Sequence, residues 1–262
     1  MAFSENMQRK LKTVLAELNI GLRDWQFLSK GDHYDVYFAD FQRKTYILRV
    51  KQHQVDNDII AEHNLWNALS LVGIAPALLY FDPDFSLSLY GGRPINQFSS
   101  YKMAHFMARF HSQNLGSQGV CQIDWQQSYP CYWQKITQSK LPLGLCHSDL
   151  LPGNILVTKK YYQLIDFQFS HYALPIIDLA VLCLYWPRVK AKRLLKSYFQ
   201  ARKISFSAAE KSAFLSACKM LYQCFRDYIL THDCRFGLAH VKKAKKRLRS
   251  IIKAFSEDTE RP

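Results

Sequence analysis

The sequence predicts an α+β fold of two lobes: a β-rich lobe over residues 1–91 and a mainly α-helical lobe over residues 92–262. Three observations favour this division. Short runs typical of strands fill much of the first 90 residues. The stretch Gly91-Gly92-Arg93-Pro94 is typical of a linker. Beyond it, apolar residues recur with the period of a helix. A chain of 262 residues, 48% of them apolar, can bury a sizeable core.

The first lobe begins with an amphipathic helix over residues 8–18, where Leu11, Val14, Leu15 and Leu18 share a face. Strand-like runs then follow one another as a β-meander, and a helix with an uneven apolar face comes next. Two further strands surround the turn at Asp82-Pro83-Asp84. The predicted meander strands, helix and last two strands are residues 25–28, 35–39, 46–50, 56–71, 76–81 and 85–90.

The second lobe opens with an amphipathic helix over residues 99–111, which carries Met103, Phe106, Met107 and Phe110 on one side. Two short strands are expected at residues 155–157 and 162–165. From about residue 170 onward the pattern is mainly helical, and only residues 256–262 are expected to be disordered.

One segment of the second lobe has a spacing that indicates chemistry. The pattern H-x-D-L-x-x-x-N runs from His147 through Asp149 to Asn154, and twelve residues later Asp166 ends a short apolar run. Asp, Asn and Gly also favour turns, so an ordinary turn is the alternative. The second carboxylate at the end of a predicted strand favours a catalytic segment instead.

Phosphoryl transfer explains why these residue types would be needed. An acceptor hydroxyl must lose a proton, and the phosphates need Mg²⁺ to neutralise their charge. Asp149 would accept the proton, while the oxygens of Asn154 and Asp166 are ligands of the kind that Mg²⁺ prefers. His147 is expected to fix the loop through a backbone hydrogen bond. The sequence therefore predicts an ATP-dependent phosphotransferase.

Residues 147–178 resemble the aminoglycoside phosphotransferase superfamily, which includes choline, ethanolamine and thiamine kinases. The resemblance rests on the loop from His147 to Asn154, on Leu164-Ile165-Asp166-Phe167 and on Asp178-Leu179-Ala180. It is strong over residues 145–182 and diffuse elsewhere. It implies a bilobal protein-kinase-like fold, ATP and Mg²⁺ as cofactors and a small-molecule acceptor. It also implies a structural role for Asp178, which would hold the backbone of the catalytic loop.

The resemblance implies nucleotide contacts in the first lobe as well. Arg49 stands where kinases carry a strand lysine, and an arginine can clamp phosphate bidentately. Glu62 would pair with Arg49. Gly31 would belong to the phosphate loop, while Leu87 and Tyr90 lie in the segment that would hold adenine through its backbone.

Two positions depart from the pattern of these kinases. The predicted phosphate loop has the single glycine Gly31 instead of a G-x-G-x-x-G. Gln168 stands where related kinases often have Glu, close to the metal and the acceptor. The acceptor and the full activity are therefore left open.

Aromatic residues flank the motif and suggest a class of acceptor. They are Trp125, Tyr132, Trp133, Tyr185 and Trp186. Aromatic faces hold small cations, so a cationic alcohol such as thiamine or choline is expected, with Trp133, Gln168 and Trp186 beside it. Thiamine kinases also resemble this chain in the patch Tyr132-Trp133-Gln134. The alternative is that these aromatics are core residues.

The net charge of +14 is concentrated near the C-terminus, where residues 188–262 hold 19 Lys and Arg but only 6 Asp and Glu. The densest run, residues 242–249, is either a solvated helix face or a surface for an anionic partner. Few aromatics interleave with it, so nucleic acid is not an expected partner. The excess also argues against polycationic aminoglycosides, and the short interval from Asp166 to Asp178 argues against a protein kinase.

Two other functions stay open: a kinase for an anionic or membrane-associated sugar, and a non-catalytic nucleotide-binding module. The apolar run at residues 179–186 is far shorter than the roughly 20 residues that a bilayer needs. Residues 1–10 lack the apolar core of a signal peptide. The seven cysteines include no C-x-x-C and are expected to be reduced, mostly core thiols. We therefore expect a cytoplasmic protein, and the sequence does not indicate its oligomeric state.

Overall fold

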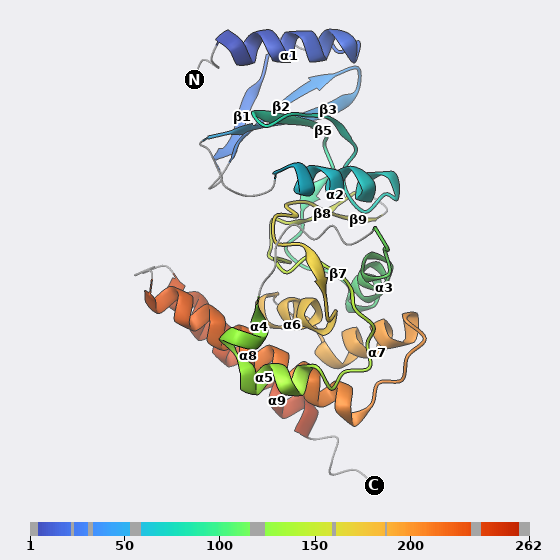
Figure 1. Ribbon diagram of the computed structural model, residues 1–262, viewed down its shortest axis with the longest axis vertical. Helices are drawn as coiled ribbons and strands as arrows, with labels where there is room; N and C mark the ends of the chain where they lie inside the picture. The colour runs from blue at the N-terminus through green and yellow to red at the C-terminus, as the bar shows by residue number, and fades with distance from the viewer. Residues whose placement is uncertain are drawn as a thin grey trace. The chain divides into compact units, whose positions relative to one another are not determined.

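The computed structural model describes residues 5–21, 24–30, 34–52, 59–115, 124–158, 161–186, 188–231 and 237–256. The chain forms two compact units, which Figure 1 shows as a ribbon. One unit combines Met1–Arg93 with Val157–Gln168, and the other combines Pro94–Leu156 with Phe169–Pro262. Residues 157–168, which the sequence analysis places in the second lobe, thus cluster with the first unit. The predicted α+β class is confirmed, because a β-sheet dominates one unit and helices dominate the other.

The first unit is built on a five-stranded antiparallel sheet with the strand order β1-β2-β3-β5-β4. The predicted meander is present, since β1, β2 and β3 follow one another in the chain and in the sheet. The strands are β1 (Gln26–Lys30), β2 (Tyr34–Phe41), β3 (Lys44–Lys51), β4 (Leu78–Phe81) and β5 (Phe85–Leu89).

Helix α1 (Glu5–Glu17) packs its apolar stripe against one face of this sheet. Leu48 of β3 and Leu87 of β5 are paired across the sheet and are both 0% exposed in this core. Side chains alternate between the two faces of a strand. Arg49 and its partners Val36 and Ser86 therefore share the opposite face.

Helix α2 (Ile59–Leu71) supplies Glu62 and Trp66, both buried, which contact Arg49. Gly92 is held at φ +109°, and a Cβ there would lie 2.3 Å from the carbonyl oxygen of Val157. Only glycine allows this approach, which explains one of the two glycines in the predicted linker. The chain passes between the two units within β6 (Arg93–Pro94) and β8 (Ile155–Val157).

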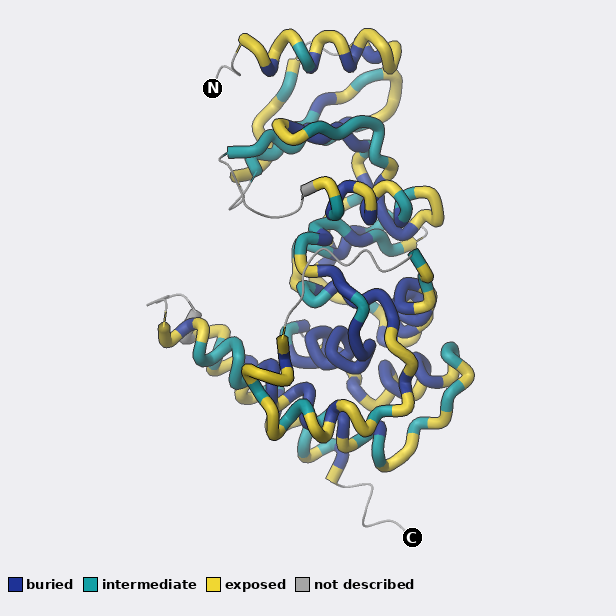
Figure 2. The backbone as a smooth tube through the Cα atoms, in the orientation of Figure 1, coloured by how far each residue is buried: buried dark blue, intermediate teal, exposed yellow. Residues whose placement is uncertain are grey.

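The second unit packs helices around a hydrophobic centre. Helix α6 is almost wholly buried, and Figure 2 shows it in dark blue. Two short strands, β7 (Gly144–Cys146) and β10 (His171–Ala173), pair antiparallel beside the loop of interest. The helices are α3 (Ser100–His111), α4 (Trp125–Ser128), α5 (Pro130–Ile136), α6 (Ile176–Tyr185), α7 (Ala191–Ala201), α8 (Ala208–Thr231) and α9 (Gly237–Ser256), and β9 is Tyr162–Leu164.

The basic run at residues 242–249 lies in α9 and follows its helical period. Ala244, Leu248, Ile251 and Phe255 are buried, so one stripe of α9 packs against the unit. The lysines between them are exposed. Most of the cationic side chains therefore form a solvated face.

The described part of the chain contains no helix that is long and apolar enough to span a membrane. Among its cysteines, Cys146, Cys183 and Cys218 are buried free thiols, Cys224 is half-buried and Cys131 is exposed. The predicted reduced thiols agree with these five. Cys121 and Cys234 lie outside the described residues. Of the predicted disordered segment 256–262, Ser256 is the last residue of α9 and the rest lies outside the described residues.

Candidate active site

The predicted catalytic loop connects β7 to β8 in the second unit. The side-chain amide of Asn154 donates to the carboxylate Oδ2 of Asp149 at 2.8 Å and to the Asp149 carbonyl at 2.9 Å. Both side chains are half-buried. The amide nitrogen of Asn154 is therefore occupied by Asp149, which leaves the amide oxygen of Asn154 as the atom that suits a cation.

Asp178 of α6 holds the start of this loop. Its Oδ2 accepts from the backbone N–H of His147 at 2.8 Å, and its Oδ1 accepts from that of Ser148 at 2.9 Å. The backbone N–H of Asp149 in turn points to Nδ1 of His147 at 3.3 Å, and His147 is fully buried. Asp178 lies in the first turn of α6, which begins at Ile176, rather than capping the helix.

The loop backbone departs from ordinary geometry between these anchors. Ser148 has φ +66° and Gly153 has φ +120°. A non-glycine residue in the left-handed region costs free energy and persists only where the surroundings impose it. Hydrogen bonds impose this geometry, because Asp178 fixes the backbone N–H groups of His147 and of Ser148 itself, and Nδ1 of His147 accepts from the N–H of Asp149 that follows.

His111 and Tyr198 extend this support into α3 and α7. Nε2 of His111 lies 3.1 Å from Oδ2 of Asp178, and the Tyr198 hydroxyl lies 2.8 Å from Nδ1 of His111. Burial lowers the pKa of His111 more than Asp178 raises it. Burial alone would raise the pKa of Asp178, but the His111 hydrogen bond and the loop N–H groups lower it overall. A neutral His111 therefore donates to an ionised Asp178 and accepts from Tyr198.

His111, Cys146 and Asp178 place a nitrogen, a sulfur and an oxygen within 4.8 Å of one another. Metal binding would require these atoms to give up their present partners. Both ring nitrogens of His111 and both oxygens of Asp178 are already hydrogen-bonded. Burial also raises the pKa of the Cys146 thiol, which keeps it protonated. The cluster is a hydrogen-bonded support for the loop.

In the first unit, Arg49 pairs with Glu62 as the sequence analysis expects. Nη1 of Arg49 lies 3.8 Å from Oε1 of Glu62, and both side chains are largely buried. The guanidinium carbon also lies over two aromatic rings, at 4.3 Å from the centroid of Tyr34 and 5.3 Å from that of Trp66. A buried cation over aromatic rings and next to a carboxylate is well stabilised.

Asp166 and Gln168 follow β9 and also belong to the first unit, and both are half-buried. Asp166 has φ +70°, a second non-glycine residue of the motif in the left-handed region. Burial is the main cause that raises the pKa of Tyr34, with further contributions from Glu62 and Asp166. The carboxylate of Asp166 is thus within electrostatic reach of the Arg49 cluster.

The three other predicted nucleotide contacts are less informative. Gly31 lies outside the described residues. Leu87 sits inside β5, paired with neighbours on both sides, and its side chain faces the α1 core rather than the Arg49 face. Tyr90 follows β5, is 46% exposed and donates its backbone N–H to Thr45. Tyr90, at the end of β5, is therefore partly accessible, whereas Leu87 in the middle of the strand is not.

The aromatics that flank the motif have different surroundings. Trp186 is 1% exposed, and its indole N–H donates to the Leu150 carbonyl at 2.6 Å. A ring buried in this way supports the loop and presents no face to an acceptor, which corrects the expectation for Trp186. Tyr185 likewise packs on Phe225 and bonds the Leu221 carbonyl. Trp133, on α5, is half-buried and keeps part of its surface accessible.

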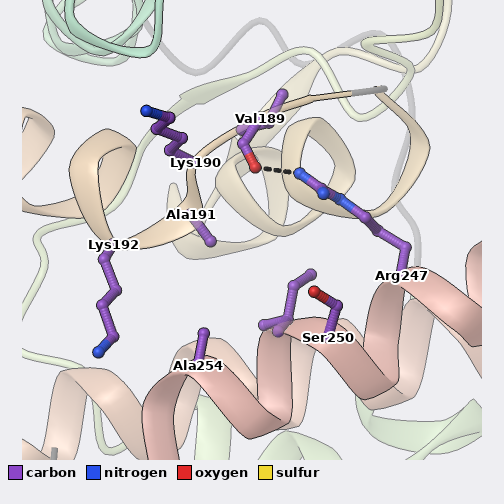
Figure 3. A pocket seen from close by; sticks show the side chains of 8 residues that line it. Val189, Lys190, Ala191, Lys192, Arg247, Ser250 and Ala254 are labelled. Atoms are coloured by element: carbon purple, nitrogen blue, oxygen red, sulfur yellow. Dashed lines mark hydrogen bonds between the residues drawn. The ribbon is translucent and has the colours of Figure 1, made fainter.

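A cavity of about 260 Å³ lies elsewhere in the second unit, between the start of α7 and helix α9 (Figure 3). Arg247 extends from α9 to donate to the carbonyls of Val189 and Cys183. The lining residues are Val189, Lys190, Ala191, Lys192, Arg247, Ser250, Ile251 and Ala254. This lining includes three cationic residues and none of the residues predicted for catalysis.

Sequence reasoning missed the residues that support the predicted ones. His111 ends the predicted amphipathic helix on its apolar side, and a titratable residue there is the only signal that the sequence offered. Trp66 lies within the helix predicted at residues 56–71, and Tyr34 directly precedes the strand predicted at residues 35–39, so neither residue stands out in the sequence.

Residues 118–214 match the model of a phosphotransferase enzyme family, APH, and this range contains Asp149, Asn154, Asp166 and Asp178. No curated protein sequence matches the chain. The match and the fold confirm the predicted likeness to this superfamily and the predicted enzyme class, a phosphotransferase acting on hydroxyl groups.

Solved structures resemble the chain over nearly its whole length. A choline/ethanolamine kinase family protein from Mesorhizobium loti is 17% identical, with a TM-score of 0.66 over 94% of this chain and 95% of that one. Choline kinase from Cryptosporidium parvum Iowa II is 12% identical, with a TM-score of 0.63 over 97% and 96%. The ADP-bound aminoglycoside phosphotransferase APH(2″)-Ib is 16% identical, with a TM-score of 0.62 over 94% and 97%. At these identities the likeness shows the fold, which is kinase-like.

Proposed function

We propose that this kinase-like phosphotransferase transfers the γ-phosphoryl group of ATP to the hydroxyl of a small cationic alcohol, with thiamine ahead of choline. The observation that carries the phosphotransfer is the loop itself. Asp149 is bound to Asn154, and the loop is anchored to Asp178 through two backbone N–H groups. Such a support fixes the carboxylate of a base in place before substrate arrives.

Asp149 would accept the proton of the acceptor hydroxyl as its oxygen bonds to the γ-phosphorus and the bond to ADP breaks. The proton then passes from Asp149 to water. Asn154 restrains the rotation of the Asp149 carboxylate through its 2.8 Å hydrogen bond. Arg49, held by Glu62, would contribute positive charge to the phosphates.

The donor set suits Mg²⁺ as the cofactor of this reaction. The hydrogen bonds of Asn154 to Asp149 leave its amide oxygen for a cation, and Asp166 offers a half-buried carboxylate. Hard oxygen ligands of this kind are typical of magnesium sites with phosphates. When bound, Mg²⁺ would neutralise charge on the transferring group. Asn154 and Asp166 are assigned as its ligands from the motif.

The acceptor class rests on the aromatic residues ahead of the loop. Trp133 and Tyr132 lie on α5 with partly accessible rings. A single delocalised positive charge needs little more than a ring face to bind. Two of the similar structures are described as choline or choline/ethanolamine kinases, which agrees with an acceptor of this size and charge. Gln168 would lie near the acceptor, as its place in the motif implies.

The proposal is tested by measuring ADP formation from Mg·ATP with thiamine, choline, ethanolamine, an aminoglycoside and a phosphorylated sugar as separate acceptors. Acceptor-dependent ADP release with thiamine or choline is expected. Trp133→Ala should then raise the KM for the acceptor. Gln134→Ala, which changes an exposed side chain of the same helix, is the control and should leave this KM unchanged. ADP release only with the phosphorylated sugar would reject the cationic acceptor and keep the phosphotransferase.

A second candidate, a kinase for an anionic acceptor such as an acidic sugar, draws on the positive charge of the second unit, which includes the exposed lysines of α9 and the cavity between α7 and α9. The three cationic residues that line this cavity, Lys190, Lys192 and Arg247, would attract an anion. Anion binding should weaken steeply with salt, whereas binding to a ring face should respond little. The salt dependence of the acceptor KM therefore separates the two acceptor classes.

A further inference from the structure

The guanidinium of Arg49 is the end member of a stack of rings in the first unit. Phe81 lies on His63, with centroids 4.5 Å apart and planes 9° from parallel. His63 is stacked at 6.2 Å on Trp66, whose ring lies 5.3 Å from the Arg49 guanidinium. The indole N–H of Trp66 also donates to the Pro76 carbonyl at 2.9 Å. The Trp66 ring that contacts Arg49 is therefore held in place by packing and by a hydrogen bond.

Tyr34 supplies a second ring, whose centroid lies 4.3 Å from the guanidinium carbon. It is the first residue of β2 and is paired with Lys51 of β3, which places both on the face of the sheet that carries Arg49. Tyr34 is the last residue of the segment 29–34, where the phosphate loop is expected from the sequence. Its ring contacts the cation that would meet the phosphates.

A planar guanidinium suits these two ring contacts, because it can stack on an aromatic ring while its edges keep their N–H donors. Glu62 takes one edge through Nη1, at 3.8 Å. A lysine ammonium has no faces to stack, so the same rings would hold a lysine less firmly. The surroundings of residue 49 thus select arginine over lysine.

We propose that Tyr34 is a positioning residue for the nucleotide phosphates, which closes an aromatic clamp on Arg49 and makes arginine the required residue at that position. This inference rests on the proposed function only where it names the phosphates; the clamp itself is a property of the first unit. The pKa of Tyr34 is raised by burial and by the charges of Glu62 and Asp166, so the hydroxyl stays protonated and adds no negative charge beside the phosphates.

The test is a double-mutant cycle on Mg·ATP affinity, measured by calorimetry with Arg49→Lys, Tyr34→Leu and the pair together. Each single variant should weaken binding by roughly five- to tenfold, the size expected for a lost cation–π contact. In the Tyr34→Leu background, Arg49→Lys should cost less than about twofold. Tyr34→Phe keeps the ring face and should retain most of the affinity.

Tyr37 provides a matched control. It lies three residues further along β2, but it pairs with Leu48 and faces the α1 core. Tyr37→Leu should disturb the same strand. In the double variant with Arg49→Lys, the loss of affinity should equal the product of the two single losses, as expected for independent sites. If the effects at positions 34 and 49 also multiply, or if Tyr34→Leu binds as tightly as Tyr34→Phe, the clamp is overturned.

Unfolding without nucleotide decides the clamp independently. The midpoint shifts of Tyr34→Leu and Arg49→Lys should be non-additive, and those of Tyr37→Leu and Arg49→Lys should be additive. Non-additivity with no Mg·ATP binding by the parent protein would reject the proposed nucleotide function and keep the clamp. Additive midpoint shifts at positions 34 and 49 would reject the clamp, whatever the nucleotide binding shows.

Discussion

At the scale of single residues, the second unit concentrates its buried polar chemistry on Asp178. This carboxylate is 0% exposed, yet it accepts from two loop N–H groups and from His111. A buried charge is tolerated only when it is hydrogen-bonded and compensated in this way. Asp178 holds the start of the loop that carries Asp149, so in the proposed reaction it would act without contacting the substrate.

Changing Asp149 to Asn should lower kcat on the order of 10² to 10⁴ fold, because the amide cannot accept the hydroxyl proton. Mg·ATP affinity should change little. Steady-state ADP formation and calorimetry measure the two effects. Asp227→Asn, which changes a half-buried carboxylate of α8 in the same unit, is the control and should keep the kcat of the parent. Full turnover by Asp149→Asn would rule out the role of base.

The neutral His111 predicts a pH dependence of stability. Burial lowers the pKa of His111 below its ordinary value of 6.5. Below pH 6.5, His111 is therefore protonated in the unfolded chain while it stays neutral in the folded protein. Folding stability from this group is complete above pH 6.5 and is lost as the pH falls, by at most about 1.4 kcal/mol per pH unit. The difference in the free energy of unfolding between the parent and His111→Gln should therefore become smaller as the pH falls from 7.5 to 5.5.

Chemical unfolding at the two pH values measures this difference. His240→Gln, an exposed histidine of α9, is the control and should show a difference that does not change with pH. Parallel stability curves for the parent and His111→Gln would mean that His111 titrates normally in the folded protein.

At the scale of elements, α9 separates its two kinds of side chain by helical period. Leu248 is 8% exposed and Ile251 is 3% exposed, whereas Lys245 and Lys246 point to solvent. The exposed lysines of the basic run in α9 therefore contribute little to the fold. The apolar stripe joins α9 to its unit, and the lysine face is left for solvent or an anionic partner.

Leu248→Ala should destabilise the protein by about 2–5 kcal/mol, through lost burial and a residual cavity. Lys245→Ala, on the exposed face of the same helix, should change stability by less than about 0.5 kcal/mol. Thermal or denaturant unfolding of both variants tests the orientation of α9. A larger loss for Lys245→Ala would place the helix the other way round.

Elements with a clear apolar period were predicted closely from the sequence. The helix expected at residues 99–111 is Ser100–His111, and the strand expected at residues 46–50 is Lys44–Lys51. The motif likewise marked Asp149, Asn154 and Asp178 because their spacing along the chain is fixed. Tyr198 and Trp66 could not be found in this way, because their roles arise from tertiary contacts with His111 and Arg49. Burial of Trp186 was also hidden, since its position beside the motif suits either a ligand contact or the core.

At the scale of the whole molecule, the motif is divided between the two units. Asp149 and Asn154 belong to one unit, and Asp166 belongs to the other through residues 157–168. Chemistry that needs all three residues therefore depends on both units being folded.

Asp166→Ala should abolish Mg²⁺-dependent ATP binding, because the substitution removes a carboxylate ligand that an amide oxygen alone cannot replace. Calorimetry with and without Mg²⁺ measures the loss. Asp84→Ala, which removes an exposed carboxylate of the same unit that pairs with Lys10, is the control and should bind as the parent does. Equally tight Mg·ATP binding by Asp166→Ala would remove Asp166 from the metal site.

The crossing of the chain at β6 and β8 also limits how the protein can be dissected. Leu164 donates its backbone N–H to Ile74 at 2.8 Å, and the Gln163 amide donates to the Ala75 carbonyl at 3.0 Å. A fragment that stops at the glycine-rich linker would lose both partners and uncover Ile74, which is otherwise 0% exposed. The first unit is thus sequence-discontinuous, and it would become an autonomous folding module only if residues 157–168 were spliced back onto the N-terminal fragment by a short linker.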